Sequence, residues 1–399
     1  MILVDAFPKT YFSQDLTPFI YSMSRDGFST HIEPLFAFEG IETTMFTGMW
    51  PNVHNVWTEF RYACKTTRTK EDWLLEIGTR TMDLLPSDLL KSRLRFAVER
   101  YLFHRLYRTP NLIPASAMSY FEPSMPRGII ESNALDGVKT AFDFFRRGGI
   151  RFVFIEPWIS GDSGVLGKVK KEVKANHKFP FWYIKLNNLD HLGHKFGPVP
   201  SMFRDGLAET DFYVEQVVTL LQKENPKLNV LVLTDHGMSK VNRSVDILQD
   251  LRQLKSRMYQ DYVLFVDSTM VRFWFFDDRA KQEVCDFLSQ TNFGHILNSK
   301  EKEFLKIPSD PRYGTLIYAL DEGYVFHPCF FHSRSLMKGM HGYAYPRTSE
   351  AVPMLIMNAE MARRTILDEG IDYTKILPLL MNSLCPGISA SNIMGGSNL

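Results

Sequence analysis

The strongest restriction on the fold comes from five short apolar runs rich in β-branched and aromatic residues. They lie at residues 2–4, 151–155, 181–186, 229–233 and 352–357. Within each run the apolar residues are nearly continuous, which is typical of strands buried on both faces of a parallel sheet. Helical patterns at 140–147 and 202–223 lie between them, and such alternation of strands and helices indicates an α/β fold.

We therefore predict one α/β domain across residues 1–399, with a mostly parallel sheet flanked by helices on both faces. The 45% of apolar residues in the chain is ample for a core of that size. Two insertions, at about 64–132 and 241–338, interrupt the alternation and are expected to form a cap. For the second we predict a helix at 245–258, a strand at 271–276, a helix near 280–289 and an irregular segment after it.

The charge balance and the cysteines exclude several classes of protein. With 46 Lys and Arg against 45 Asp and Glu, the net charge is +1 and gives no reason to expect nucleic acid or an anionic membrane as the main partner. No apolar run is long enough to span a membrane. The chain begins with a strand-like run and no signal-like pattern, so we expect a cytoplasmic location. Four cysteines are scattered without a CxxC pair, and we expect them to be reduced core residues: Cys64, Cys285, Cys329 and Cys385.

Polar clusters lie at or just beyond the predicted strand ends. In chain order their Asp and His residues are Asp5, Asp190, His194, Asp235, His236 and His341. Any one of them alone is equally typical of a helix cap or a turn. However, ligands bind at the carboxyl ends of strands in α/β sheets, and carboxylate and imidazole are the common ligands of Zn²⁺. Three Asp and three His are enough for two metals with three protein ligands each.

These clusters resemble the motifs of the alkaline phosphatase superfamily, and within it of the nucleotide pyrophosphatase/phosphodiesterase branch. DHLGHKFGP at 190–198 is similar to the DxxGHxxGP motif, and TDHGM at 234–238 and GMHGY at 339–343 are similar to the next two motifs. TGMWPNVH at 47–54 resembles the segment that follows the family nucleophile. The order, the spacing and the flanking glycines all agree.

The resemblance implies a metal-ligand set and an activity. Asp190, His194 and His341 would hold one divalent ion, and Asp5, Asp235 and His236 would hold another, with zinc the usual metal and manganese the alternative. The implied reaction is hydrolysis of a phosphodiester or nucleotide pyrophosphate bond in a small-molecule phosphate ester or nucleotide-like substrate. Phosphomonoester, phosphonate and sulfate ester hydrolases of the same superfamily are the nearest alternatives.

The nucleophile region departs from the family pattern. The family has Thr or Ser nine residues before the threonine of its TG pair, and Phe38 occupies that position here. Three interpretations follow. Thr43 or Thr44 takes the role; or Glu39 or Glu42 ligates a metal or acts as a base while water attacks at the metal; or the nucleophile is lost and the chain is a non-catalytic metal-binding protein.

Two basic features receive a weaker functional interpretation. Arg272 and Lys338 are candidates for contacting phosphate. The basic amphipathic pattern at 91–108 fits a membrane surface or a partner, although such a stripe more often packs on its own core.

Overall fold

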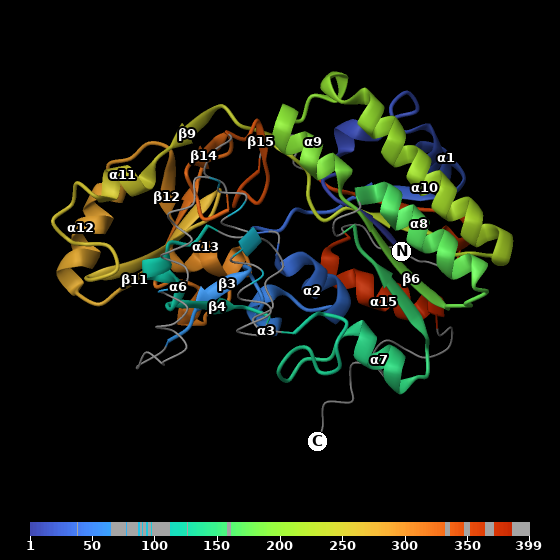
Figure 1. The fold of residues 1–399 in the computed structure, drawn as a ribbon, viewed down its shortest axis with the longest axis horizontal. Helices are drawn as coiled ribbons and strands as arrows, with labels where there is room; N and C mark the ends of the chain where they lie inside the picture. Colours follow the sequence, from blue (N-terminus) through green and yellow to red (C-terminus); the bar gives the residue numbers. More distant parts are fainter. Residues whose placement is uncertain are drawn as a thin grey trace.

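The computed structural model describes residues 1–37, 39–64, 112–125, 127–157, 161–331, 336–346, 352–363 and 371–384, together with positions 77, 87, 90, 93, 94 and 97. Two lobes are visible in Figure 1, one built on a six-stranded sheet and the other on a four-stranded sheet. The candidate site belongs to the first lobe.

The six-stranded sheet confirms the predicted α/β fold. Its strands, in spatial order, are β2 (Phe28–His31), β16 (Met354–Met357), β7 (Leu231–Leu233), β1 (Ile2–Val4), β6 (Phe181–Leu186) and β5 (Phe152–Ile155). The four strands from β7 to β5 are mutually parallel, whereas β16 runs antiparallel to both of its neighbours. The sheet is therefore mixed but mostly parallel.

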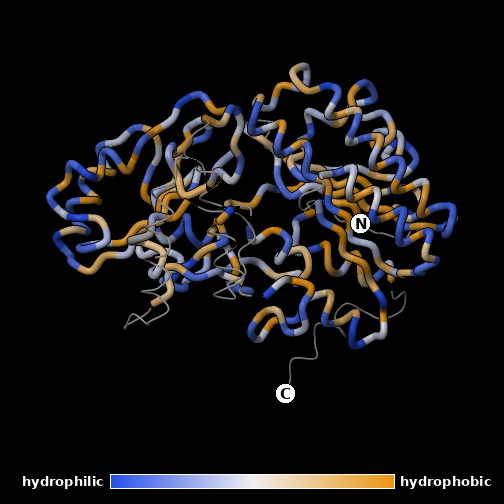
Figure 2. Tube along the Cα trace, viewed as in Figure 1, coloured by the Kyte–Doolittle hydropathy of each residue, from blue (hydrophilic) through white to orange (hydrophobic). Residues whose placement is uncertain are grey.

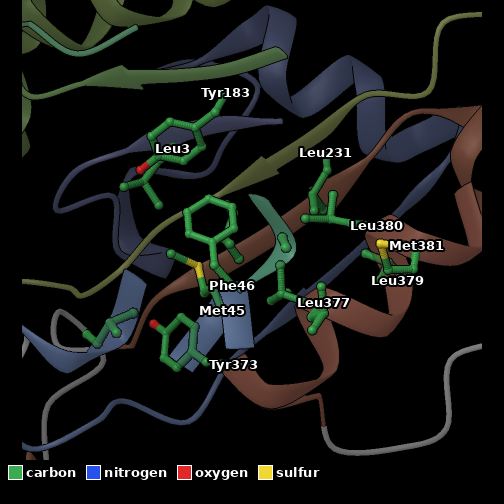
Figure 3. Packing of buried hydrophobic residues seen from close by; sticks show 14 of the residues in the cluster. Leu3, Met45, Phe46, Tyr183, Leu231, Tyr373, Leu377, Leu379, Leu380 and Met381 are labelled. Atoms are coloured by element: carbon green, nitrogen blue, oxygen red, sulfur yellow. The ribbon is translucent and has the colours of Figure 1, made fainter. Parts of the chain in front are cut away.

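Helices cover both faces of this sheet. One face carries α1 (Pro18–Asp26), α8 (Gly161–Lys174) and α10 (Arg204–Glu224), and the other carries α2 (Gly40–Thr47), α7 (Ala141–Arg147) and α15 (Ile376–Leu384). Successive strand residues point to opposite faces, so Tyr183 and Leu3 pack with Phe46 of α2 (Figure 3), while Ile184 packs toward α10. Figure 2 shows apolar segments gathered in the interior of this lobe, beside the N-terminus.

The second lobe is an antiparallel sheet with helices. Its strands are β10 (Tyr262–Val266), β11 (Met270–Phe275), β13 (Leu316–Leu320) and β12 (Gly294–Ile296), and its helices are α11 (Ile247–Leu251), α12 (Asp278–Ser289) and α13 (Ser299–Phe304). The predicted strand at 271–276 and helix near 280–289 are confirmed. The prediction of an irregular segment after that helix is wrong, because the segment contains β12, α13 and β13.

The helix predicted at 245–258 is also wrong in extent. Asp246 caps α11, which ends after five residues. The residues that gave the helical spacing, from Val245 to Met258, do all pack on one core. These residues belong to a strand, a helix and a turn in succession. The apolar spacing therefore indicated which residues are buried, but not that they form one continuous helix.

Short elements complete the described part of the chain. Two-stranded sheets pair β3 (Phe60–Tyr62) with β4 (Phe121–Pro123), β8 (Ser239–Lys240) with β15 (Gly339–Met340), and β9 (Arg243–Val245) with β14 (Tyr324–Phe326). The remaining helices are α3 (Pro51–His54), α6 (Ala115–Met118), α9 (Asn188–Phe196), α14 (Ala359–Ala362), η1 (Lys9–Tyr11), η2 (Pro200–Met202), η3 (Pro311–Tyr313) and η5 (Tyr373–Lys375).

Several predictions concern peripheral features. Most of the amphipathic pattern at 91–108 lies outside the described residues, as does Cys385. Cys329 is buried as expected and Cys285 half-buried, but Cys64 is exposed, so its assignment to the core is wrong. None of the helices in the described ranges is both long and apolar enough to cross a membrane.

Candidate metal centre and nucleophile region

The parallel strands bring the predicted metal ligands to one edge of the sheet. Asp5 directly follows β1, and its amide donates a hydrogen bond of 2.8 Å to the carbonyl of Leu186 at the end of β6. Asp235 and His236 follow β7. The hydroxyl of Tyr373 (Figure 3) donates hydrogen bonds to the carbonyls of Thr234 and Asp235, which holds the chain in place just after β7.

Helix α9 carries Asp190 and His194 on one face, four residues apart. The carboxylate of Asp162 in α8 accepts hydrogen bonds from the amides of Asn187 (2.9 Å) and Asn188 (3.3 Å), which satisfies the start of α9. This fixes the direction in which the helix leaves the sheet.

The first group of donors is Asp190, His194 and His341, whose ligand atoms all lie within 4.8 Å of one another. Oδ1 of Asp190 is 3.3 Å from Nε2 of His194 and 3.4 Å from Nε2 of His341. Nδ1 of His194 hydrogen-bonds the Gly339 carbonyl at 2.9 Å, so its Nε2 is directed at the carboxylate. A metal-binding histidine is oriented by a bond of this kind.

Two motif glycines allow this group to assemble. A Cβ on Gly339 would lie 2.4 Å from the carbonyl oxygen of Gly193, and one on Gly193 would lie 2.7 Å from Cε of Met238. The Gly339 position tolerates no side chain at this distance from the backbone of α9, whereas at Gly193 the obstacle is the flexible side chain of Met238. Because His341 directly follows β15, that approach sets the distance between His341 and Asp190.

The second group of donors is Asp5, Asp190 and His236. Nε2 of His236 is 3.2 Å from Oδ1 of Asp5, and its Nδ1 hydrogen-bonds the Gly237 carbonyl at 2.9 Å. Within the described ranges, Asp235 is in neither group of donors. Its Oδ1 accepts hydrogen bonds from the amides of His236 (3.0 Å) and Ala6 (3.4 Å).

Two members of the first group have an ionisation that suits metal binding. Burial, together with the charge of His236, lowers the pKa of His341 to about 3, so its imidazole is neutral at physiological pH. Burial opposes ionisation of Asp190, but His194 and His341 hold the pKa of that carboxyl well below its usual value. Burial would lower the pKa of His194, but Asp190 raises it, so a metal at this imidazole competes with a proton. Neutral imidazole and ionised carboxylate are the forms that bind metals, and this donor set fits zinc or manganese.

The second group is ionised differently. Burial would lower the pKa of His236, but Asp235 and Asp5 raise it to about 10. The imidazole is therefore cationic and paired with Asp5. A metal could bind its Nε2 only after that proton leaves.

A residue that the sequence analysis missed lies at the centre of the second group. Nζ of Lys185 in β6 is 2.9 Å from Oε1 of Glu42, 3.3 Å from Oδ2 of Asp5 and 3.7 Å from Oδ2 of Asp235. Burial alone would lower the pKa of Lys185, but these carboxylates raise it well above its usual value. The sequence did contain a sign of this interaction, namely a single lysine within the apolar run 181–186. Charged residues are rarely buried without partners, so a lysine in a buried strand predicts a nearby carboxylate.

The nucleophile candidates Thr43 and Thr44 are both fully buried in α2. Oγ1 of Thr44 donates to the Gly40 carbonyl at 2.9 Å and lies 3.0 Å from Nε2 of His54. Nδ1 of His54 accepts from the amide of Val56, which assigns the ring proton to Nε2 as donor to Thr44. The Thr44 hydroxyl is thus committed on both sides. Oγ1 of Thr43 makes no hydrogen bond within the described residues.

The carboxylates of this region have separate environments. Glu42 points to Lys185 and so reaches the metal centre. The charge of Glu39 instead acts on Asp267, whose pKa it helps to raise after burial. Phe38 lies outside the described residues.

Arg272 and Lys338 were the predicted contacts for phosphate, and the structure contradicts the prediction for Arg272. Its side chain is fully buried, and Nη1 donates to Oγ1 of Thr58 and to the Phe60 carbonyl, both at 2.9 Å. Its proposed contact with phosphate is therefore wrong. Lys338 stays a candidate, since its amide donates to the carbonyl of His194 at 2.8 Å.

Comparison with known proteins agrees with this geometry. The family described as type I phosphodiesterase / nucleotide pyrophosphatase matches residues 1–344. The chain belongs to this family. It is 22% identical over 209 residues to ectonucleotide pyrophosphatase/phosphodiesterase family member 7 of Mus musculus, a match that covers 48% of this chain and 47% of that protein. The match thus spans about half the length of that relative.

Solved structures share the fold. Murine ectonucleotide pyrophosphatase/phosphodiesterase 5 has a TM-score of 0.66 and 14% identity, with 96% of this chain and 94% of that chain covered. The human protein of the same name has a TM-score of 0.65, 15% identity and the same coverage. An inactive variant of the murine protein, in complex with AMP, also has a TM-score of 0.65, again at 15% identity and with the same coverage.

Proposed function

We propose that the chain hydrolyses a phosphodiester or nucleotide pyrophosphate bond with the help of a divalent metal, most simply zinc, held by Asp190, His194 and His341. The observation that carries the proposal is the convergence of these three donors within 4.8 Å. The ionisation of Asp190 and His341 and the orientation of His194 support it. A bound divalent ion would supply Lewis-acid stabilisation of phosphoryl oxygens.

The chain's own residues have distinct tasks in this proposal. His194, His341 and Asp190 would hold the ion, and Oδ1 of Asp190 lies 3.3 and 3.4 Å from the Nε2 atoms of the two histidines. The side chains of Asp5, Asp235 and Lys185 lie beside this group with that of His236, whose ring stacks on the ring of His341 at 3.6 Å. The predicted second ion would lie among these residues and compete with Lys185 for Asp5 and Asp235.

The substrate class is proposed from the family and its neighbours. The AMP complex of the murine structure supports a nucleotide-like substrate, although the likeness at 15% identity establishes only the shared fold. Phosphomonoester, phosphonate and sulfate ester hydrolysis remain the alternatives within the superfamily. The cap formed by the two insertions and the cytoplasmic location stay predictions.

A non-catalytic metal-binding protein is the second candidate, and a specific observation favours it. Phe38 supplies no hydroxyl, and the hydroxyl of Thr44 is committed to Gly40 and His54. Of the two predicted nucleophiles, Thr43 is therefore the one whose hydroxyl is available, and water is the alternative.

The test is hydrolysis of bis-p-nitrophenyl phosphate by the full chain reconstituted with zinc or manganese. We expect metal-dependent turnover that is lost in His341→Ala and kept in His177→Ala, whose imidazole pairs with Glu172 on the surface. Thr43→Val then separates the nucleophiles, because turnover by water would survive it. Metal binding without turnover of this diester, of p-nitrophenyl phosphate or of the sulfate ester would overturn the hydrolase and support the second candidate.

A further inference from the structure

The position expected for a second metal already holds a cation. Lys185 lies within ion-pair distance of Asp5 and Asp235, two of the three residues predicted to bind that ion. It is also paired with Glu42, at 2.9 Å. The three carboxylates come from β1, β7 and α2, so the ammonium joins three separate segments at the edge of the sheet.

We propose that the ammonium of Lys185 takes the place of the second metal ion, and that the chain binds one divalent ion, through Asp190, His194 and His341. The inference rests on the metal site of the proposed function but not on the hydrolysis itself.

The position of Lys185 is fixed by the sheet. It lies within β6 opposite Leu3 of β1, between residues that pack into the other face. Its side chain therefore points to the α2 face, where it is 19% exposed and Glu42 is 8% exposed. Withdrawing the ammonium would leave the buried carboxylate of Glu42 without this counter-charge, which is strongly unfavourable.

A cation already lies among the carboxylates on this side. The ammonium of Lys185 faces all three of them, those of Asp5, Asp235 and Glu42. A divalent ion at Asp5 and Asp235 would lie a few ångströms from the ammonium. In a buried site such repulsion is weakly screened.

The donor geometry points the same way. Oδ1 of Asp235 is used by the amides of His236 and Ala6, and its Oδ2 faces Lys185. In the described part of the chain, the compact group at Asp190, His194 and His341 contains no lysine contact of this kind.

The experiment counts bound metal in the full chain. Protein freed of metal is dialysed against zinc, and its zinc content is measured by inductively coupled plasma mass spectrometry. We expect one ion per chain in the wild type and two in Lys185→Met, which keeps the length of the side chain and removes its charge. Lys178→Met, a change at an exposed lysine just before β6, should stay at one, and His341→Ala should fall below one.

Two ions in the wild type, or one in a folded Lys185→Met, would overturn the inference. Folding is checked by far-ultraviolet circular dichroism. If that variant does not fold, ¹¹³Cd NMR of the wild type decides, with one resonance expected and two contradicting it. Two ions with hydrolysis intact would leave the proposed function standing, while one ion without hydrolysis would overturn only the proposed function.

Discussion

Arg272 is the fully buried cation of the second lobe, and replacing it tests how the lobe tolerates buried charge. Its guanidinium lies 3.4 Å from Oδ2 of Asp267, 4.8 Å over the ring of Phe265, and is hydrogen-bonded to Thr58 and Phe60. Arg272→Met keeps the apolar stem and removes the charge. It leaves Asp267 as a buried carboxylate without its partner, a change that typically costs about 3–5 kcal/mol.

The cost depends on pH in a direction that the structure fixes. Burial raises the pKa of Asp267 from 3.8 to about 6 even with Arg272 beside it. The folded state therefore binds the proton more tightly than the unfolded state, and stability falls as pH rises from about 4 to 6. At about 1.4 kcal/mol per pKa unit, this loss levels off at about 3 kcal/mol in the wild type.

Without Arg272 the pKa of Asp267 is higher still, so the loss continues to higher pH. A carboxyl that folds only when protonated costs about 1.6 kcal/mol at pH 5 and about 6 kcal/mol at pH 8. We therefore expect Arg272→Met to be more destabilising at pH 8 than at pH 5 by about 3 kcal/mol.

The assay is urea unfolding followed by tryptophan fluorescence at both pH values. The metal centre is common to all variants, so its own titration cancels in the differences between them. Asp267→Asn is the matched control, and the double variant Asp267→Asn, Arg272→Met should lose the pH dependence. An equal destabilisation by Arg272→Met at pH 5 and pH 8 would refute the reasoning.

Two further predictions concern the metal centre and helix α2. In Gly339→Ala the new Cβ would lie 2.4 Å from a backbone oxygen of Gly193, so β15 must shift. We expect zinc affinity, measured by competition with a chelator, to fall by about 10-fold or more, and an unchanged affinity would contradict the packing argument. Thr44→Val removes the acceptor of His54 Nε2 and should lower the free energy of unfolding, measured in urea, by about 1–3 kcal/mol. Thr43→Val should change it little, because the oxygen it removes makes no hydrogen bond within the described residues. Equal effects of the two variants would refute the assignment of the hydrogen bonds.

Much of the fold and the site could be predicted from local sequence. Apolar runs that end in polar residues identified the strands, and parallel strands necessarily bring their carboxyl ends together. The direction of β16 could not be predicted, because a run buried on both faces looks the same in either direction. The strands β12 and β13 were missed because each lies in a segment that also contains turns and a short helix.

The ion pair between Lys185 and Glu42 could not be predicted from the sequence, for a different reason. The two residues are 143 positions apart, and neither belongs to a motif of the family. The lysine in an apolar strand could have been noticed, but its partners depend on how α2 packs on the sheet. Sequence motifs therefore identified the metal-ligand candidates and left out the lysine and the glutamate that lie beside them.

The residue at the expected nucleophile position and the lysine among the carboxylates are chemically consistent with each other. In the family pattern, one ion activates the hydroxyl nucleophile, and here the position of that hydroxyl is Phe38. The carboxylates Asp5 and Asp235 that would hold such an ion are retained, and without a cation they would repel each other in a buried site. Lys185 supplies that positive charge, and Glu42 fixes the lysine in place. A site with Phe38 at that position and Lys185 among these carboxylates has no need of the second ion, which leaves Asp190, His194 and His341 as the group where metal chemistry is still expected.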